Sequence, residues 1–465
     1  MDLKKILHNL PEVTHPIEKK LSFNQKLKWT LIILVAFFIL ANIPLFGLAK
    51  NALERFEYLA IILGTDFGSI ISLGIGPIVM ASIILQLLVG SGILKIDVST
   101  SEGKKYFQGL QKLGVLFFIL FEALVYVIMG GLQAVPGFAW LVVVQLILGG
   151  LAIMFMDEVT TKWGFGSGVS IFIVAGVAWR IIAGLIQFIG PTGENCLRDF
   201  AGTACAGKLL VIVQSVINPA PKELLVAVAA ILVTIIIFLG VVWAQSLKVE
   251  IPLSYERLRG YGVKWPLAFF YASNIPVILA AALLANLQLF GGLLQNSLGH
   301  ATFLGDFQNG QAVSGLAFWL GHSNVVEVLI RNNGFSAVPV AIFFQAITHI
   351  IFFMAISAVF AVLWVKTAGM DESSQAKKII SSGLQIPGFR KDQRVLESIL
   401  KRYILPLTIM GGLAVGALSA FADILGALTS GTAILLAVMI MYQLYQNVAQ
   451  QHAVDMHPAL KKIVE

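Results

Sequence analysis

Charged side chains are scarce in this sequence, and their scarcity limits what the chain can do. Only 12% of its 465 residues are charged, whereas 58% are hydrophobic, and the mean hydropathy is +0.87. The long apolar runs hold few ionisable residues, mainly Glu122, Arg180 and His349. None of the three has a partner at helical spacing, and a lone histidine is more often a packed, hydrogen-bonded side chain than a ligand. Transporters and intramembrane enzymes place ionisable residues inside the bilayer, so both classes are disfavoured.

Catalytic motifs are also missing. The sequence has neither an HExxH zinc motif nor a Walker A motif, so we expect no metal chemistry and no ATP hydrolysis by the chain itself. A serine lies between glycines in WGFGSGVS (163–170), but the pattern is not GxSxG, and no histidine and aspartate are paired with it. These glycines more simply permit a tight turn. We therefore expect no catalytic residue, no metal and no cofactor.

Cysteine is limited to two residues, Cys196 and Cys205, which lie in one polar segment, ENCLRDFAGTACAGK. Their separation allows a small closed loop, and the outer side of a membrane can be oxidising. A disulfide and two unpaired thiols both remain open at this point. A bond here would fasten a loop rather than take part in chemistry.

What the sequence does contain is a series of apolar runs of membrane-spanning length. About 20 apolar residues span the hydrocarbon core of a bilayer. We expect ten such spans, which makes the chain an all-α polytopic membrane protein. They cover residues 29–48, 73–91, 113–135, 138–156, 168–189, 223–244, 267–290, 337–365, 403–421 and 424–444. We expect no cleavable signal in the mixed segment 1–28.

Lysine and arginine predict the orientation, because cytoplasmic loops of membrane proteins are enriched in them. Most of the 32 lysines and arginines lie in 1–28, in 447–465, or in the connections that follow the second, fourth, sixth and eighth spans. These segments share one side of the membrane, so we expect both termini in the cytoplasm. Two long cytoplasmic loops, 245–266 and 366–402, are basic, and the first alternates as a hairpin would. Each is either a solvated positive-inside loop or a surface for a large partner, such as ribosomal RNA or anionic lipid.

The two halves of the chain resemble each other weakly. The second span begins GIGPIV (74–79), and the seventh contains SNIPVI (273–278). An odd number of spans in each half, 29–189 and 223–446, inverts one half relative to the other; the outer loop 190–222 joins them. Inverted repeats with broken helices place the working site between the halves. A secondary transporter shares that architecture and is the alternative.

A pore for large cargo needs a seal, and hydrophobic constrictions close by dewetting. Branched aliphatic residues four apart share a helix face, as do Ile75 with Val79 and Val169 with Ile173. Ile278 follows the proline of the seventh span. Each of these residues, taken singly, is as consistent with ordinary helix packing.

Several motifs occur together and in order along the chain. They are LGIGPIVMASIILQLLVGSG (73–92), FQGLQKL (107–113), GFGSGVSIFIVAG (164–176), SNIPVILAAALLANLQ (273–288), GFRK (388–391), KRYILPLT (401–408) and GALTSGTAILL (426–436). With this set, nearly the whole chain resembles the SecY family, the large subunit of the protein-conducting translocon, in its archaeal form. The resemblance implies ten helices in two inverted five-helix halves around a central pore.

The resemblance also implies roles for particular residues. The pore ring would be Ile75, Val79, Val169, Ile173, Ile278 and Leu436. A plug would occupy about 55–67, with Phe56, Leu59, Ile62 and Thr65. Gln86 and Asn286 match polar positions of a lateral gate, although Met80 replaces a family threonine. The residues expected to dock a ribosome are Arg257, Arg259, Lys264, Arg390 and Lys391.

The resemblance implies partners as well. These are a small SecE/gamma-type subunit, a small beta subunit, the ribosome, a signal-bearing nascent polypeptide and membrane lipid. The expected function is a passive channel in the cell (plasma) membrane, which translocates unfolded secretory chains and releases apolar segments sideways into lipid.

Overall fold

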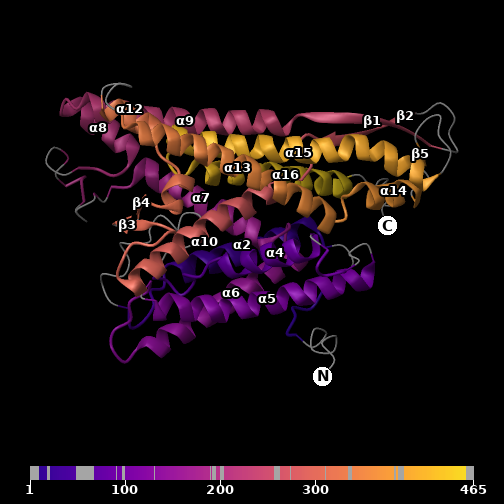
Figure 1. Cartoon of the computed structure of the whole chain (residues 1–465), viewed down its shortest axis with the longest axis horizontal. Coiled ribbons are helices and arrows are strands. Elements are labelled where there is room, and N and C mark those ends of the chain that lie inside the picture. Colours follow the sequence, from indigo (N-terminus) through magenta and orange to yellow (C-terminus); the bar gives the residue numbers. More distant parts are fainter. Residues whose placement is uncertain are drawn as a thin grey trace.

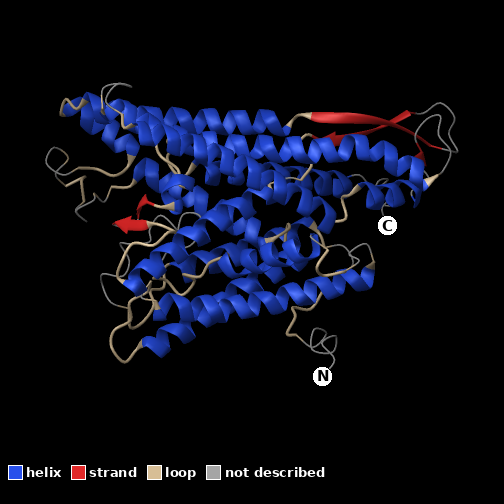
Figure 2. Ribbon diagram, in the orientation of Figure 1, coloured by secondary structure: helices blue, strands red, loops and turns tan. Residues whose placement is uncertain are grey.

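The computed structural model describes most of the chain. The described residues are 10–17, 21–48, 68–90, 92–96, 100–129, 131–188, 190, 195–198, 200, 204–255, 262–272, 274–308, 311–332, 338–381, 384–385 and 392–456. These residues are mostly helical, as expected, and Figure 2 shows helices along the whole length of the molecule.

A helix forms at each of the ten predicted spans. They are α2 (Phe23–Ala41), α4 (Gly76–Gly90), α5 (Ser101–Ile128), α6 (Ala139–Trp163), α7 (Gly168–Ile186), α9 (Pro221–Gln245), α10 (Ile275–Leu298), α13 (Val340–Thr367), α15 (Gln393–Leu425) and α16 (Gly431–Met456). Within the described residues, nine of the helices are long and apolar enough to cross a membrane. The tenth, α4, has 15 residues.

The short α4 follows a compact turn at residues 68–75. Within this turn, Ser72 Oγ accepts the Gly68 N–H at 2.8 Å and donates to the Ser69 carbonyl at 2.6 Å. Gly74 has φ +55°, a conformation that residues with a side chain rarely adopt. Pro77 lies in the first turn of α4, where its missing N–H costs no helical hydrogen bond. The turn therefore allows α4 to begin within the thickness of a bilayer instead of at its surface.

Figure 1 shows how the two halves of the chain are arranged. Helices α5 and α6 lie along one side of the molecule, α9, α13 and α15 lie along the other, and α10 lies between them. Helix α10 packs on α13 and α15 of its own half and on α4 of the first half. Helix α16 likewise packs on α7. Helix α13 packs on α4 as well, so the two halves meet along α4 and α7 of the first half and α10, α13 and α16 of the second.

The basic loop at 245–266 forms the hairpin that its alternation predicted. Strand β1 (Lys248–Tyr255) pairs antiparallel with β2 (Gly262–Ala268), with Val249 opposite Leu267. The short β5 (Leu384–Gln385) joins the other edge of β1, so the two basic loops form one three-stranded sheet. This sheet and α14 (Glu372–Ser381) lie at one end of the molecule in Figure 1.

The opposite end of the molecule holds the remaining short elements. These are α8 (Lys208–Ile217), β3 (Asp306–Gln308), β4 (Gln311–Ser314), α11 (Leu316–Leu320) and α12 (Val325–Arg331). Figure 1 places α8, α12, β3 and β4 at this end. Loops assigned to opposite sides of the membrane from the sequence therefore lie at opposite ends of the structure.

Candidate pore and lateral seam

The six predicted ring residues come from the elements along which the two halves meet. Ile75 closes the turn before α4, Val79 lies in α4, and Val169 and Ile173 lie in α7. Ile278 lies in the first turn of α10, and Leu436 lies near the start of α16. Five of them are buried in one continuous apolar core, and Val169 is partly buried against that core.

Local hydrogen bonds fix the ends of the helices that carry these residues. The Asp157 carboxylate of α6 accepts the Val169 N–H at 2.9 Å and so satisfies one of the free N–H groups at the start of α7. Gly168 permits this approach, because a Cβ there would lie 2.5 Å from the Asp157 Cα. In α10, the Ile278 N–H donates to the Asn274 carbonyl at 3.1 Å. Ring residues therefore lie at helix starts that the fold holds in place.

The polar residues expected in the lateral gate lie on adjacent helices, α4 and α10. Both Gln86 and Asn286 are buried. The Asn286 amide donates to the Ala282 carbonyl of its own helix at 2.8 Å, and Gln86 Oε1 has no hydrogen-bond partner among the described residues. The two amides therefore do not bond to each other in this structure. Met80 is partly buried against the apolar core.

Three contacts cross the lateral seam, by which we mean the surface where α4 and α5 face α10 and α13. None of them was expected from the sequence. Leu363 of α13 lies against Gly90 at the end of α4, where an added Cβ would come within 2.5 Å of Leu363 Cδ2. Phe121 of α5 and Phe290 of α10 have ring centroids 6.4 Å apart. Beyond them, the Asn296 amide donates to the Met129 carbonyl at 3.0 Å. These contacts join α4 and α5 to α10 and α13, and no sequence pattern could have paired residues so far apart.

Glu122 is the buried carboxyl of this region. It lies in α5 next to Phe121 in sequence, is almost fully buried, and its Oε1 has no hydrogen-bond partner among the described residues. A buried charge without a partner is costly. Glu122 is therefore a polar group held inside the apolar packing of α5, close in sequence to the seam residue Phe121.

His349, which has no partner in sequence, has partners in the fold. Its Nδ1 lies 2.7 Å from the Leu320 carbonyl, and its Nε2 lies 3.4 Å from Asp423 Oδ2. Asp423 in turn accepts the Thr432 N–H at 2.8 Å. The expectation of a packed, hydrogen-bonded histidine is confirmed. All of these groups belong to the second half, so they stabilise that half rather than form a site between the halves.

The plug residues Phe56, Leu59, Ile62 and Thr65 lie outside the described residues, as do Arg257, Arg259, Arg390 and Lys391. Lys264 lies in β2, where its Cα is opposite that of Pro252. Of the two basic loops, the structure therefore describes the strands β1, β2 and β5 but not the arginines between them.

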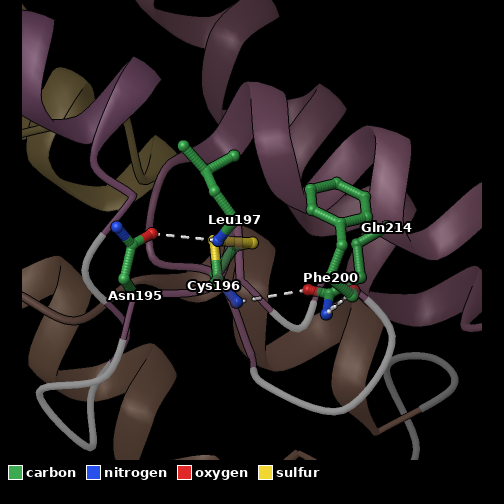
Figure 3. The surroundings of a disulfide bond; sticks show 6 residues. Asn195, Cys196, Leu197, Phe200 and Gln214 are labelled. Carbon is green, nitrogen blue, oxygen red and sulfur yellow. Dashed lines mark hydrogen bonds between the residues drawn. A yellow bond between two sulfur atoms is a disulfide. The ribbon is translucent and has the colours of Figure 1, made fainter.

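The two cysteines, Cys196 and Cys205, are joined by a disulfide in this structure. Figure 3 shows Gln214 of α8 beside the loop that the bond closes. The Gln214 side chain donates to the Phe200 carbonyl at 2.9 Å and accepts the Cys205 N–H at 3.2 Å. The loop and α8 are therefore held together as one unit.

Comparison with known proteins places this geometry in context. The model of the SecY family matches residues 69–445. The protein translocase subunit SecY of Methanothermobacter thermautotrophicus is 44% identical over 460 residues, which cover 98% of this chain and 96% of that protein. A solved structure described as a protein-conducting channel is 38% identical, with TM-score 0.82 and 99% of both chains covered. Sec61 in a canine ribosome–channel complex from the endoplasmic reticulum is also 38% identical, with TM-score 0.79 and 99% of both chains covered.

Proposed function

Because this chain belongs to the SecY family, we propose that it is the channel subunit of a protein translocase. It passes unfolded secretory polypeptides across the membrane and releases transmembrane segments laterally into lipid. The chain supplies a conduit and a seal, and the driving force comes from a partner. No side chain is assigned a catalytic role.

The observation that carries this proposal is the position of the aliphatic ring residues. Ile75, Val79, Val169, Ile173, Ile278 and Leu436 come from both halves, and all belong to or pack on one apolar core. An apolar constriction excludes ions by dewetting, without a gate made of charged groups. An unfolded chain can still pass, because the ring is made of side chains on separate helices that can move apart.

The seam of α4 and α5 against α10 and α13 supports the lateral release. Its contacts include the packing of Leu363 on Gly90, the aromatic pair of Phe121 and Phe290, and the hydrogen bond from Asn296 to the Met129 carbonyl. No strand ladder or ion pair crosses it among the described residues. Such a seam opens by separating packed side chains, without breaking a strand ladder. Apolar segments that reach it can then partition into lipid.

We further propose that residues of about 55–67 act as a plug on the outer side of the ring. Residues 68–75 turn sharply before α4, and this turn ends at Ile75, one of the proposed ring residues. Gln86 and Asn286 then supply polar side chains in the seam, which a signal sequence contacts as it enters.

The sheet formed by β1, β2 and β5 supports a ribosome-docking role for the two basic loops. It brings the ends of both loops together at one end of the molecule (Figure 1). Arginine binds phosphate in a bidentate manner, which suits Arg257, Arg259 and Arg390 for contacts with ribosomal RNA. Lys264 and Lys391 add charge. One similar channel is described in a complex with a ribosome.

The remaining assignments complete this proposal. The chain lies in the cell membrane with both termini in the cytoplasm, and a SecE/gamma-type subunit and a small beta subunit bind it. The secondary-transporter alternative is not favoured, because it needs a cluster of charged groups that binds an ion or substrate between the halves, whereas Gln86 and Asn286 are uncharged amides that do not bond to each other. The buried polar cluster around Asp423 lies within the second half alone.

The function is tested by reconstituting the full chain, with the small subunits that purify with it, into vesicles. Ribosomes that carry a secretory chain are added, and protection of that chain from protease is measured. We expect protection that depends on the channel and on a signal sequence. Empty vesicles are the control. Bound ribosomes without any protected chain would contradict the proposal.

A further inference from the structure

The short helix α8 has an unusual distribution of side chains. It belongs to the outer loop between α7 and α9, packs on both of them, and lies at the end of the molecule opposite the hairpin of β1 and β2 (Figure 1). Leu209, Val213, Val216 and Ile217 are 45–69% exposed. Residues at these spacings share one face of a helix. The exposed face of α8 is therefore apolar.

The opposite side of α8 is the more polar one. Ser215 is buried against the protein. Gln214 is bonded to the disulfide loop through the Phe200 carbonyl and the Cys205 N–H (Figure 3). A helix of a water-soluble surface shows the reverse arrangement, with polar residues outward. The apolar face of α8 therefore requires an apolar surrounding.

The neighbouring helices indicate what that surrounding is. Ile186 at the end of α7 and Leu225 in the first turns of α9 are both exposed and apolar. Both belong to helices of membrane-spanning length, so their exposed faces meet lipid. Phe188, just beyond α7, is also exposed. The apolar face of α8 continues this lipid-facing surface past the ends of the two helices.

We propose that α8 is an interfacial helix, whose apolar face lies among the lipid acyl chains of the outer leaflet. On its polar side, Gln214 stays bonded to the disulfide loop through the Phe200 carbonyl and the Cys205 N–H. Amphipathic helices of this kind bury their apolar face at the boundary between headgroups and acyl chains. The loop between the two halves would then be anchored to the membrane. This inference is independent of polypeptide conduction.

A fluorescent label at a single introduced cysteine tests this proposal. The chain has two cysteines and both are in the disulfide, so Val216→Cys provides one reactive thiol. Val216 is the most exposed of the four residues, so the substitution removes little packing. The full chain is reconstituted in phosphatidylcholine vesicles. The quenchers are aqueous iodide and lipids that carry a nitroxide either near the headgroup or at the end of the acyl chain.

Two further labelled variants calibrate the measurement. Leu232→Cys places the label on the exposed face of α9 in mid-span, and Gln308→Cys places it on an exposed polar position of β3. We expect the Val216→Cys label to be quenched most by the shallow nitroxide and to be as protected from iodide as the Leu232→Cys label. Quenching by iodide equal to that of Gln308→Cys would overturn the proposal. Protection from iodide and from both nitroxides would also overturn it, because a second copy or a partner protein would then cover α8.

Discussion

Asn296 of α10 donates its side-chain amide to the backbone carbonyl of Met129 at the end of α5, at 3.0 Å. This bond joins the two halves of the chain at the end of the seam through which we propose that apolar segments leave. It lies beyond the aromatic pair of Phe121 and Phe290. The closed seam therefore has a specific polar contact as well as apolar packing.

Asn296→Ala should favour the open seam. A hydrogen bond contributes about 1 kcal/mol, so its loss should shift the equilibrium between closed and open about fivefold. The measurement is the distance between spin labels at Leu120 of α5 and Leu298 of α10, both exposed. Asn42→Ala is the matched control, because Asn42 donates to Phe38 within its own helix. Equal distance distributions in both variants would contradict the role of Asn296.

Gly149→Ala should destabilise the fold through the turn that carries Ile75. A Cβ on Gly149 of α6 would overlap the Ile70 carbonyl, which belongs to the backbone of that turn. Overpacking of this kind costs about 1–3 kcal/mol. Gly240→Ala in α9 is the control, because nothing lies within 4 Å of its added Cβ. Thermal denaturation of the purified protein should separate the two variants, and equal midpoints would contradict the packing argument.

Ile278→Asn should make the ring leak ions. The amide offers hydrogen bonds to water, and an unpaired buried amide costs about 1–3 kcal/mol, so water should enter the constriction. Ile278→Val keeps the apolar character and should remain tight. The readout is ion flux through vesicles that contain the full chain. A variant with asparagine that is as tight as the unmodified chain would mean that Ile278 does not line the seal.

Reduction of the bond between Cys196 and Cys205 should loosen the loop that is bonded to Gln214 of α8. A disulfide that closes a loop of this size contributes about 2–3 kcal/mol in the chain-entropy model. Hydrogen exchange in residues 195–205 should accelerate in the variant with both cysteines replaced by serine. Exchange in α13, which is remote in sequence, should not change. Thiols that react with an alkylating reagent before any reduction would show that the bond is absent.

The sequence predicted the helical core well, because an apolar run of spanning length satisfies its backbone polar groups in lipid only as a helix. Each of the ten runs coincides with a helix. The alternating residues VEIPL (249–253) lie in strand β1. The ends were less accurate. Helix α5 begins at Ser101 and α15 at Gln393, each before the apolar run, because a helix continues into water after hydropathy falls.

The site was less accessible from the sequence. Motifs supplied the ring residues, but periodicity alone could not separate Ile278 from any other buried isoleucine. Contacts between residues far apart in the chain left no local signal, as with Asn296 and Met129. Asp423, the partner of His349, carried no signal because it lies between two predicted spans. Helix α8 was hidden in a loop because its apolar run is too short to span a membrane.

The most direct test of the account is crosslinking from the ring to a polypeptide in transit. A photoreactive residue is placed at Val79 of α4 and, separately, at Ile278 of α10, one from each half. A stalled secretory chain on a ribosome is then presented to the reconstituted protein, with Leu232 on the exposed face of α9 as the control position. The account predicts crosslinks to the stalled chain from both ring positions and none from Leu232. Bound ribosomes without a crosslink from either ring position would contradict it.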